Sequence, residues 1–181
     1  MLGRKHTSGS PRRQAAKKAA RQAERTELAE AIRKLVAEVR LGGGILAFNR
    51  AGSTWLESTK ELEVGDVRKD RYLLRGCSFP TGYRCGALAE VLFSMAHEWG
   101  HHLAWLPGGW LHEYNSCSAS ERAPLTPRQD TVRDECSAWI AGEAYIPRRL
   151  RPLYWERARY CLATYGISRK QFEAERAKNT R

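Results

Sequence analysis

Residues 95–103 read Met-Ala-His-Glu-Trp-Gly-His-His-Leu, and two of these histidines stand four positions apart. An apolar run without a helix breaker leads into this stretch, so the sequence predicts a helix over about Ala87–Leu103. On such a helix His97 and His101 share one face. Gly100 leaves part of the same helix bare, and a neighbouring backbone could pack closely there.

The spacing of His97, Glu98 and His101 is the HExxH pattern of zinc peptidases. Two imidazoles on one face can bind one Zn²⁺, and a third protein ligand leaves the fourth position for water. Glu98 would then act as the catalytic general base, taking a proton from water and passing one to a leaving amine. The extended pattern HExxHxxGxxH is excluded, because Ala104 and Pro107 stand where it needs glycine and histidine.

The third zinc ligand is predicted to be Glu135. The run 131–144 has helical spacing, and Glu135 lies roughly 40° from the apolar stripe residue Trp139 around the helix. A carboxylate beside a buried stripe is costly unless something neutralises it, and a zinc ion would do so. Asp134 and His112 remain alternative ligands at this point. His102 points away from His101 and is expected to be a core or supporting histidine.

Three motifs in order carry a resemblance to a known family. After the HExxH pattern the chain continues with Glu-x-x-Ala-Trp-x-Ala at 135–141, with Ile146-Pro147 and with a closing segment at 162–176. This order resembles the ImmA/IrrE-type zinc metallopeptidases over about residues 28–178. The chain departs from that family at Trp99 and His102, and the gap before Glu135 is longer.

The resemblance implies a zinc-dependent endopeptidase in which His97, His101 and Glu135 bind Zn²⁺ and Glu98 catalyses. It also implies a protein substrate, with a DNA-binding transcriptional repressor of a mobile element or stress response as one example. Two alternatives are weighed against it. One is a SprT-like protease acting on DNA-bound protein, which needs a third histidine such as His112. The other is a non-catalytic zinc-site module that binds protein, which has no use for Glu98.

The expected fold class is α+β: a zincin-like minimal peptidase core, mostly helical, with a small antiparallel or mixed sheet. Thr26 is expected to cap a helix that ends before three glycines at 42–44. Short strands are expected at about 45–48, 55–56, 62–64 and 71–75. The last of these is a candidate edge for binding an extended substrate.

Three regions are expected: a disordered basic tail at 1–25, the peptidase core at 26–147 and a C-terminal basic helical element at 148–181. The last region reads as a helix-turn-helix-like pair, with Gly166 ending one helix and Ser168 capping the next. The resemblance to ImmA/IrrE-type peptidases implies that this pair packs on the core.

The net charge of +11 is concentrated at the two ends of the chain. Residues 1–25 hold eight Lys or Arg and one acid, and residues 148–181 hold ten and three, whereas the middle is slightly acidic. Nucleic acid is therefore a candidate partner of the termini. No apolar run is long enough for a membrane span, and five cysteines without a Cys-x-x-Cys pair suit a reducing, cytoplasmic setting. The sequence leaves the oligomeric state open.

Overall fold

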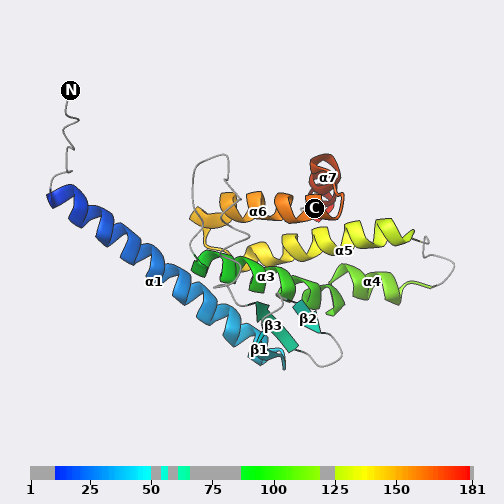
Figure 1. Cartoon of the computed structure of the whole chain (residues 1–181). Helices are drawn as coiled ribbons and strands as arrows, with labels where there is room; N and C mark the ends of the chain where they lie inside the picture. The colour runs from blue at the N-terminus through cyan, green and yellow to red at the C-terminus, as the bar shows by residue number, and fades with distance from the viewer. Residues whose placement is uncertain (1–10, 50–53, 57–60, 66–86, 119–124, 180–181) are drawn as a thin grey trace, which may run out of the picture.

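The apolar run before the HExxH pattern forms α3 (Ala87–Trp105), the central helix of the molecule. The computed structural model describes residues 11–49, 54–56, 61–65, 87–118 and 125–179. The other helices are α1 (Pro11–Leu41), α4 (Trp110–Ser116), α5 (Pro127–Gly142), α6 (Arg151–Thr164) and α7 (Arg169–Asn179), with short 3-10 turns η1 (Glu143–Tyr145) and η2 (Arg148–Leu150). Figure 1 shows α3 between the small sheet and α5, with α6 and α7 on the far side of α5.

Three short strands form the sheet: β1 (Ile45–Asn49), β2 (Thr54–Leu56) and β3 (Glu61–Gly65). Their order is β1-β3-β2, with β1 parallel to β3 and β2 antiparallel to it. These strands lie where the sequence placed its first three strand pieces. The fourth expected strand, at 71–75, lies outside the described residues.

The α+β class expected from the sequence is nevertheless wrong, because the described residues form a predominantly helical assembly. Among the side chains whose burial is described, the hydrophobic core comes mostly from α1, α3, α5, α6 and α7, with Leu62 from β3. The three strands have only three to five residues each, whereas the helices that surround α3 have up to 31. The helices therefore determine the architecture, and the expectation of a mostly helical chain holds.

Two glycines allow α3 and α5 to pack with their backbones close together. A Cβ on Gly100 of α3 would collide with the backbone carbonyl of Ala138 in α5, as the sequence suggested for this glycine. Conversely, a Cβ on Gly142 of α5 would lie 2.6 Å from the carbonyl oxygen of Ala96 in α3. Real Cβ atoms do not approach so closely, and close-packed interiors adjust poorly to added volume. The two helices thus meet backbone to backbone beside His97.

The helix α5 begins earlier than its apolar stripe predicted, and its first turn explains why. Thr126 caps it: the side chain of Thr126 accepts a hydrogen bond from the Gln129 backbone, and the Gln129 side chain accepts one from the Thr126 backbone. Pro127 takes the first helical position, where a missing N–H costs nothing. This reciprocal cap fixes the start of the helix that carries Glu135.

The prediction of a disordered tail at 1–25 is wrong from Pro11 onward, because α1 is helical from there to Leu41. From Arg12 to Ala23 every residue is Ala, Gln, Lys or Arg, all of them strong helix formers. Thr26 is not a cap but an interior residue, and its hydroxyl donates to the Gln22 carbonyl. Only the later part of α1 is anchored, through buried Leu28, Leu35 and Val39.

The C-terminal helices pack on the core as expected. Gly166 adopts a positive φ of 71° after α6, a conformation that glycine reaches without strain. Ser168 caps α7 through its side chain, which accepts from the Gln171 backbone. Phe172 is buried with its ring 5.5 Å from that of Trp155, so α7 is held by an aromatic contact to α6.

None of the helices in the described parts of the chain combines the length and the apolar character that a membrane crossing requires.

Candidate metal centre

The close contact of α3 and α5 brings together three of the side chains singled out in the sequence. His97 and His101 from α3 and Glu135 from α5 each offer one ligand atom, and these atoms all lie within 4.8 Å of one another. The His97 and His101 rings are 4.7 Å apart between centroids, as expected for neighbours one turn apart on a helix. Among the described residues this is the group that could hold a metal ion.

His97 is held in the neutral form that a metal ligand requires. Its ring stacks on Trp139 with 4.3 Å between centroids and 22° between planes. Burial lowers the pKa of His97 well below its usual value, and the neighbouring His101 and the Arg157 guanidinium lower it further. A metal ion therefore has no proton to displace from His97 near neutral pH.

Glu135 is buried, and one of its oxygens lacks a hydrogen bond. Its Oε2 has no hydrogen-bond partner among the described residues and lies 3.5 Å from Nε2 of His97. Burial raises the pKa of Glu135, while His101 and a hydrogen bond from the Tyr165 hydroxyl oppose that rise. An unpaired buried carboxylate oxygen is costly, and a cation at this position would remove that cost.

Asp134 lies next to Glu135 in the chain but serves a different partner. Its Oδ2 is 3.2 Å from Nδ1 of His101. Burial lowers the pKa of His101, but the hydrogen bond and charge of Asp134, with the charges of Glu98 and Glu135, outweigh this and raise it. Metal-bound histidines commonly donate their other ring N–H to a carboxylate in this way. Asp134 is therefore placed to orient His101 and leaves its other nitrogen free for a metal.

Glu98 follows His97 directly on α3 and is partly buried. Its negative charge raises the pKa of His101 and also contributes to the raised pKa of Tyr165. Burial is the largest cause that raises the pKa of Tyr165 to about 12, and the charge and hydrogen bond of Glu135 add to this rise. Tyr165 is thus linked to the prospective ligands by its hydrogen bond to Glu135.

The remaining histidine candidates lie elsewhere. His112 is exposed on α4 and is not part of the cluster. His102 is buried, and its ring packs against Trp99 at 4.4 Å between centroids. Trp99 itself donates from its indole nitrogen to the Tyr145 hydroxyl at 3.1 Å. His102 and Trp99, which depart from the family pattern, therefore serve the core.

Sequence reasoning missed three contributors to the centre. The role of Asp134 as a partner of His101 was hidden because it was considered only as a ligand. Tyr165 stands thirty residues beyond Glu135 and carries no motif signal of its own. Arg157 influences His97 from α6 while its Nε lies 3.2 Å from Oε2 of the buried Glu90. Long-range packing places the last two, so no local pattern could have indicated them.

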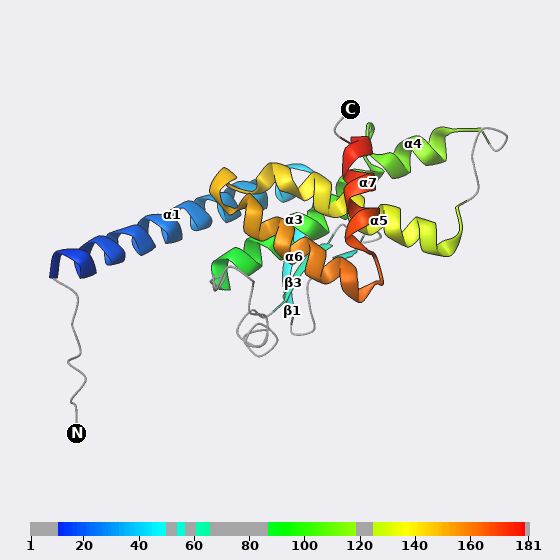
Figure 2. The same cartoon turned by 90° about the horizontal axis from the view of Figure 1, so that it is seen from above.

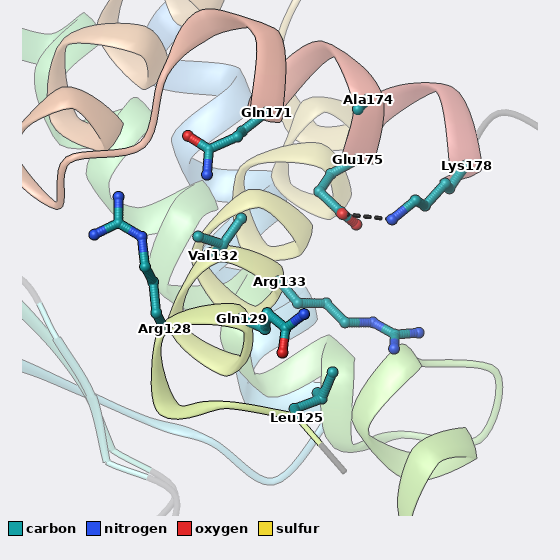
Figure 3. A pocket seen from close by; sticks show the side chains of 9 residues that line it. All are labelled: Leu125, Arg128, Gln129, Val132, Arg133, Gln171, Ala174, Glu175 and Lys178. Atoms are coloured by element: carbon teal, nitrogen blue, oxygen red, sulfur yellow. Dashed lines mark hydrogen bonds and ion pairs between the residues drawn. The ribbon is translucent and has the colours of Figure 1, made fainter. Parts of the chain in front are cut away.

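A groove of about 320 Å³ lies between α5 and α7, one to two turns along α5 from Glu135 (Figure 3). Cationic side chains line it, but the chain already uses them: Arg128 donates to the Gly166 carbonyl, Arg133 lies over the Trp110 ring and Lys178 pairs with Glu175. The metal cluster is not part of its lining. The groove is thus a neighbour of the centre and not its entrance.

No family model matches this chain, and searches of the curated proteins and of the solved structures found no match either.

Proposed function

We propose that this protein is a zinc-dependent endopeptidase that uses His97, His101 and Glu135 as metal ligands and Glu98 as general base. The observation that carries the proposal is the convergence of these ligand atoms within 4.8 Å, with the buried Oε2 of Glu135 lacking a hydrogen bond. A neutral buried His97 and a positioned His101 supply the nitrogen ligands.

Zinc is the metal that this donor set suits best. Two imidazole nitrogens and one carboxylate oxygen match the ligand set of catalytic zinc sites that keep one position open. Harder cations such as Mg²⁺ and Ca²⁺ favour oxygen ligands throughout. When bound, zinc would act as a Lewis acid that polarises the substrate carbonyl and makes water more acidic.

The residues of the chain would supply the proton transfers and the orientation. Glu98 would accept a proton from the attacking water and deliver it to the nitrogen of the departing amine. Asp134 would hold His101 in one tautomer. Tyr165 is half exposed as a residue, and its hydroxyl, which donates to Glu135, would keep that carboxylate in place.

A protein substrate follows from the resemblance to ImmA/IrrE-type peptidases, which also makes a DNA-binding repressor a candidate substrate. Five cysteines without a Cys-x-x-Cys pair suit a reducing, cytoplasmic setting. The SprT-like alternative needs a third histidine ligand, and the exposed position of His112 on α4 speaks against it.

Metal analysis tests the ligand set. The purified protein should hold about one zinc per chain, and Glu135→Ala should lose it while His112→Ala keeps it. Both variants remove one candidate ligand, so each is the control for the other. Full zinc binding by Glu135→Ala together with loss in His112→Ala would reverse the assignment.

Peptidase activity is tested against a complex mixture of folded proteins, because a narrow-specificity peptidase can ignore generic substrates. New N-termini are identified by mass spectrometry after incubation with wild type and with Glu98→Gln. The wild type should generate cleavages that Glu98→Gln makes about 10²–10⁴ times more slowly, at unchanged zinc content. Equal cleavage by both proteins would exclude Glu98 as the base. A wild type that binds zinc yet cleaves nothing in a mixture from its own host would favour the non-catalytic module.

A further inference from the structure

The N-terminal part of α1 extends from the molecule as a bare helix. Residues 11–23 are all exposed, and the first buried residue of α1 is Leu28. Figures 1 and 2, two views at right angles, both show this end of α1 reaching away from the other helices. At a rise of 1.5 Å per residue, residues 11–23 span roughly 20 Å. We call residues 11–23 the arm.

The base of the arm is fixed to the body of the protein. Arg149, which follows the peptidase-like core, forms ion pairs with both Glu24 and Glu27 of α1. Burial of Leu28, Leu35 and Val39 holds the rest of the helix. These contacts determine the direction of the arm, and they also engage the acidic groups nearest to it.

Most basic side chains of the arm and its base fall on one face, which at the base also includes Glu24, the ion-pair partner of Arg149. Arg13, Lys17, Arg21 and Arg25 recur every four residues, and Lys18 lies beside them, within a sector of about 140° around the helix. Successive charges along this row are about 6 Å apart. Apart from Arg12 in the first turn, the opposite face consists of small side chains: Ala15, Ala16, Ala19, Ala20 and Ala23. The arm thus presents a straight row of cations on a preformed helix.

We propose that this basic face binds the phosphate backbone of duplex DNA. Lysine and arginine that neutralise phosphates release condensed counterions, which drives association. The major groove of B-DNA, about 12 Å wide, admits a single α-helix. Residues 11–23 include no acidic side chain, and Glu24 at the base forms an ion pair with Arg149, so the arm itself meets the duplex without like-charge repulsion. The contacts are to phosphates, which position a protein on DNA without reading its sequence.

Other polyanions fit the face less well. A helix that binds an anionic membrane carries Trp, Phe or Leu opposite its basic face, whereas residues 11–27 include none of these. Double-stranded RNA has a major groove too deep and narrow for a helix. DNA binding through the arm does not depend on the metal centre or on peptidase activity.

The test measures binding of the full chain to a fluorescein-labelled 20-base-pair duplex by anisotropy, over salt from about 50 to about 200 mM. The arm variant is Arg13→Gln, Lys17→Gln and Arg21→Gln, because glutamine preserves helix propensity. The matched control is Arg169→Gln, Lys170→Gln and Lys178→Gln, which removes the same charge from exposed sites on α7. Melting temperature should be unchanged in the arm variant, since the arm buries no side chain in the body.

We expect the arm variant to lower the salt slope of binding by about 2.7, which is 0.9 for each lost phosphate contact. Raising the salt from about 50 to about 200 mM weakens binding by some factor, and this factor should be about 40 times smaller for the arm variant than for wild type. The control should keep the wild-type slope. An arm variant with wild-type affinity and slope, or a larger loss in the α7 control, would overturn the proposal.

Two further measurements test whether the helical form of the arm matters and whether the partner is DNA. Ala19→Pro keeps every charge but breaks the arm, and it should weaken binding several-fold. Wild-type affinity in this variant would mean that the segment acts as an unstructured polycation. Vesicles containing about 30% phosphatidylserine should bind less tightly than the duplex at equal salt. Tighter binding to vesicles would replace DNA by a membrane surface as the partner.

Discussion

Asp134 follows directly before the proposed ligand Glu135, yet the two carboxylates point at different histidines. Asp134 contacts Nδ1 of His101, whereas Glu135 lies near Nε2 of His97. Successive helix residues differ by about 100° in direction, so two neighbouring carboxylates cannot occupy the same position around a metal. One of them therefore becomes a ligand candidate and the other a support for a ligand.

We predict that Asp134→Asn weakens zinc binding by about 10- to 100-fold while the fold is retained, because the hydrogen-bonded carboxylate orients His101 and increases its basicity. Competition with a chromogenic zinc chelator measures the affinity. Asp130→Asn, an exposed site one turn earlier on α5, is the matched control and should leave affinity unchanged. Equal affinities for both variants would show that Asp134 does not position His101.

Tyr154 gives a prediction for stability and its pH dependence. It is fully buried, and its hydroxyl donates to the Trp139 carbonyl at 2.8 Å. Burial raises the pKa of Tyr154 well above 10, and the charge of Glu143 adds to this. The folded state keeps the phenol neutral while the unfolded chain ionises it above about pH 10. This contribution to stability is thus complete below about pH 10 and lost as the pH rises further.

Tyr154→Phe should cost about 1–2 kcal/mol of unfolding free energy at pH 7, because the Trp139 carbonyl loses its donor. The same variant should show a shallower fall in stability above pH 10 than wild type. Urea unfolding at pH 7 and at pH 10.5 measures both effects. Tyr160→Phe, at a half-exposed position, should change neither value. If the unfolding free energy fell equally between pH 7 and pH 10.5 in Tyr154→Phe and wild type, ionisation of Tyr154 would not be the cause of that fall.

At the scale of elements, the contact between α3 and α5 depends on glycine. Gly100→Ala increases helix propensity by up to about 1 kcal/mol, but its Cβ would collide with the Ala138 carbonyl. Overpacking typically costs about 1–3 kcal/mol, and a backbone atom cannot rotate away. We therefore expect a net loss of roughly 1–2 kcal/mol in urea unfolding, together with weaker zinc binding as Glu135 moves from His97. A variant as stable as wild type with unchanged zinc affinity would show that α5 can shift freely.

Local patterns predicted the elements that carry the site but not those that depend on distant contacts. The His pair, the apolar run before it and the stripe around Trp139 were sufficient to locate α3 and α5. The arm was missed because its helix rests on intrinsic propensity, with no apolar periodicity to indicate it. The α+β assignment failed because short strand signals carry no information on how far helices would dominate the described part of the chain.

At the scale of the whole molecule, zinc binding should contribute to folding stability. The proposed ligands come from α3 and α5, so the unfolded chain lacks a formed site and the metal stabilises the native state. Zinc at 100 times its dissociation constant would add about 2.7 kcal/mol. For a domain of this size that corresponds to a rise in melting temperature of about 5–10 °C.

Thermal unfolding with zinc and with a chelator measures this shift. His112→Ala should show the same rise as wild type, whereas Glu135→Ala should show little or none. A full zinc-dependent rise in Glu135→Ala would mean that the stabilising metal binds elsewhere in the chain.

The ion pairs of Arg149 with Glu24 and Glu27 also bear on the order in which the protein assembles. These partners are separated by more than 120 residues of chain, and the ribosome delivers the N-terminus first. The helix α1 can therefore form early by its own propensity, but Arg149 can fix its direction only after most of the protein has been synthesised. A truncated product that ends before Arg149 would have a complete basic arm without this attachment to the body.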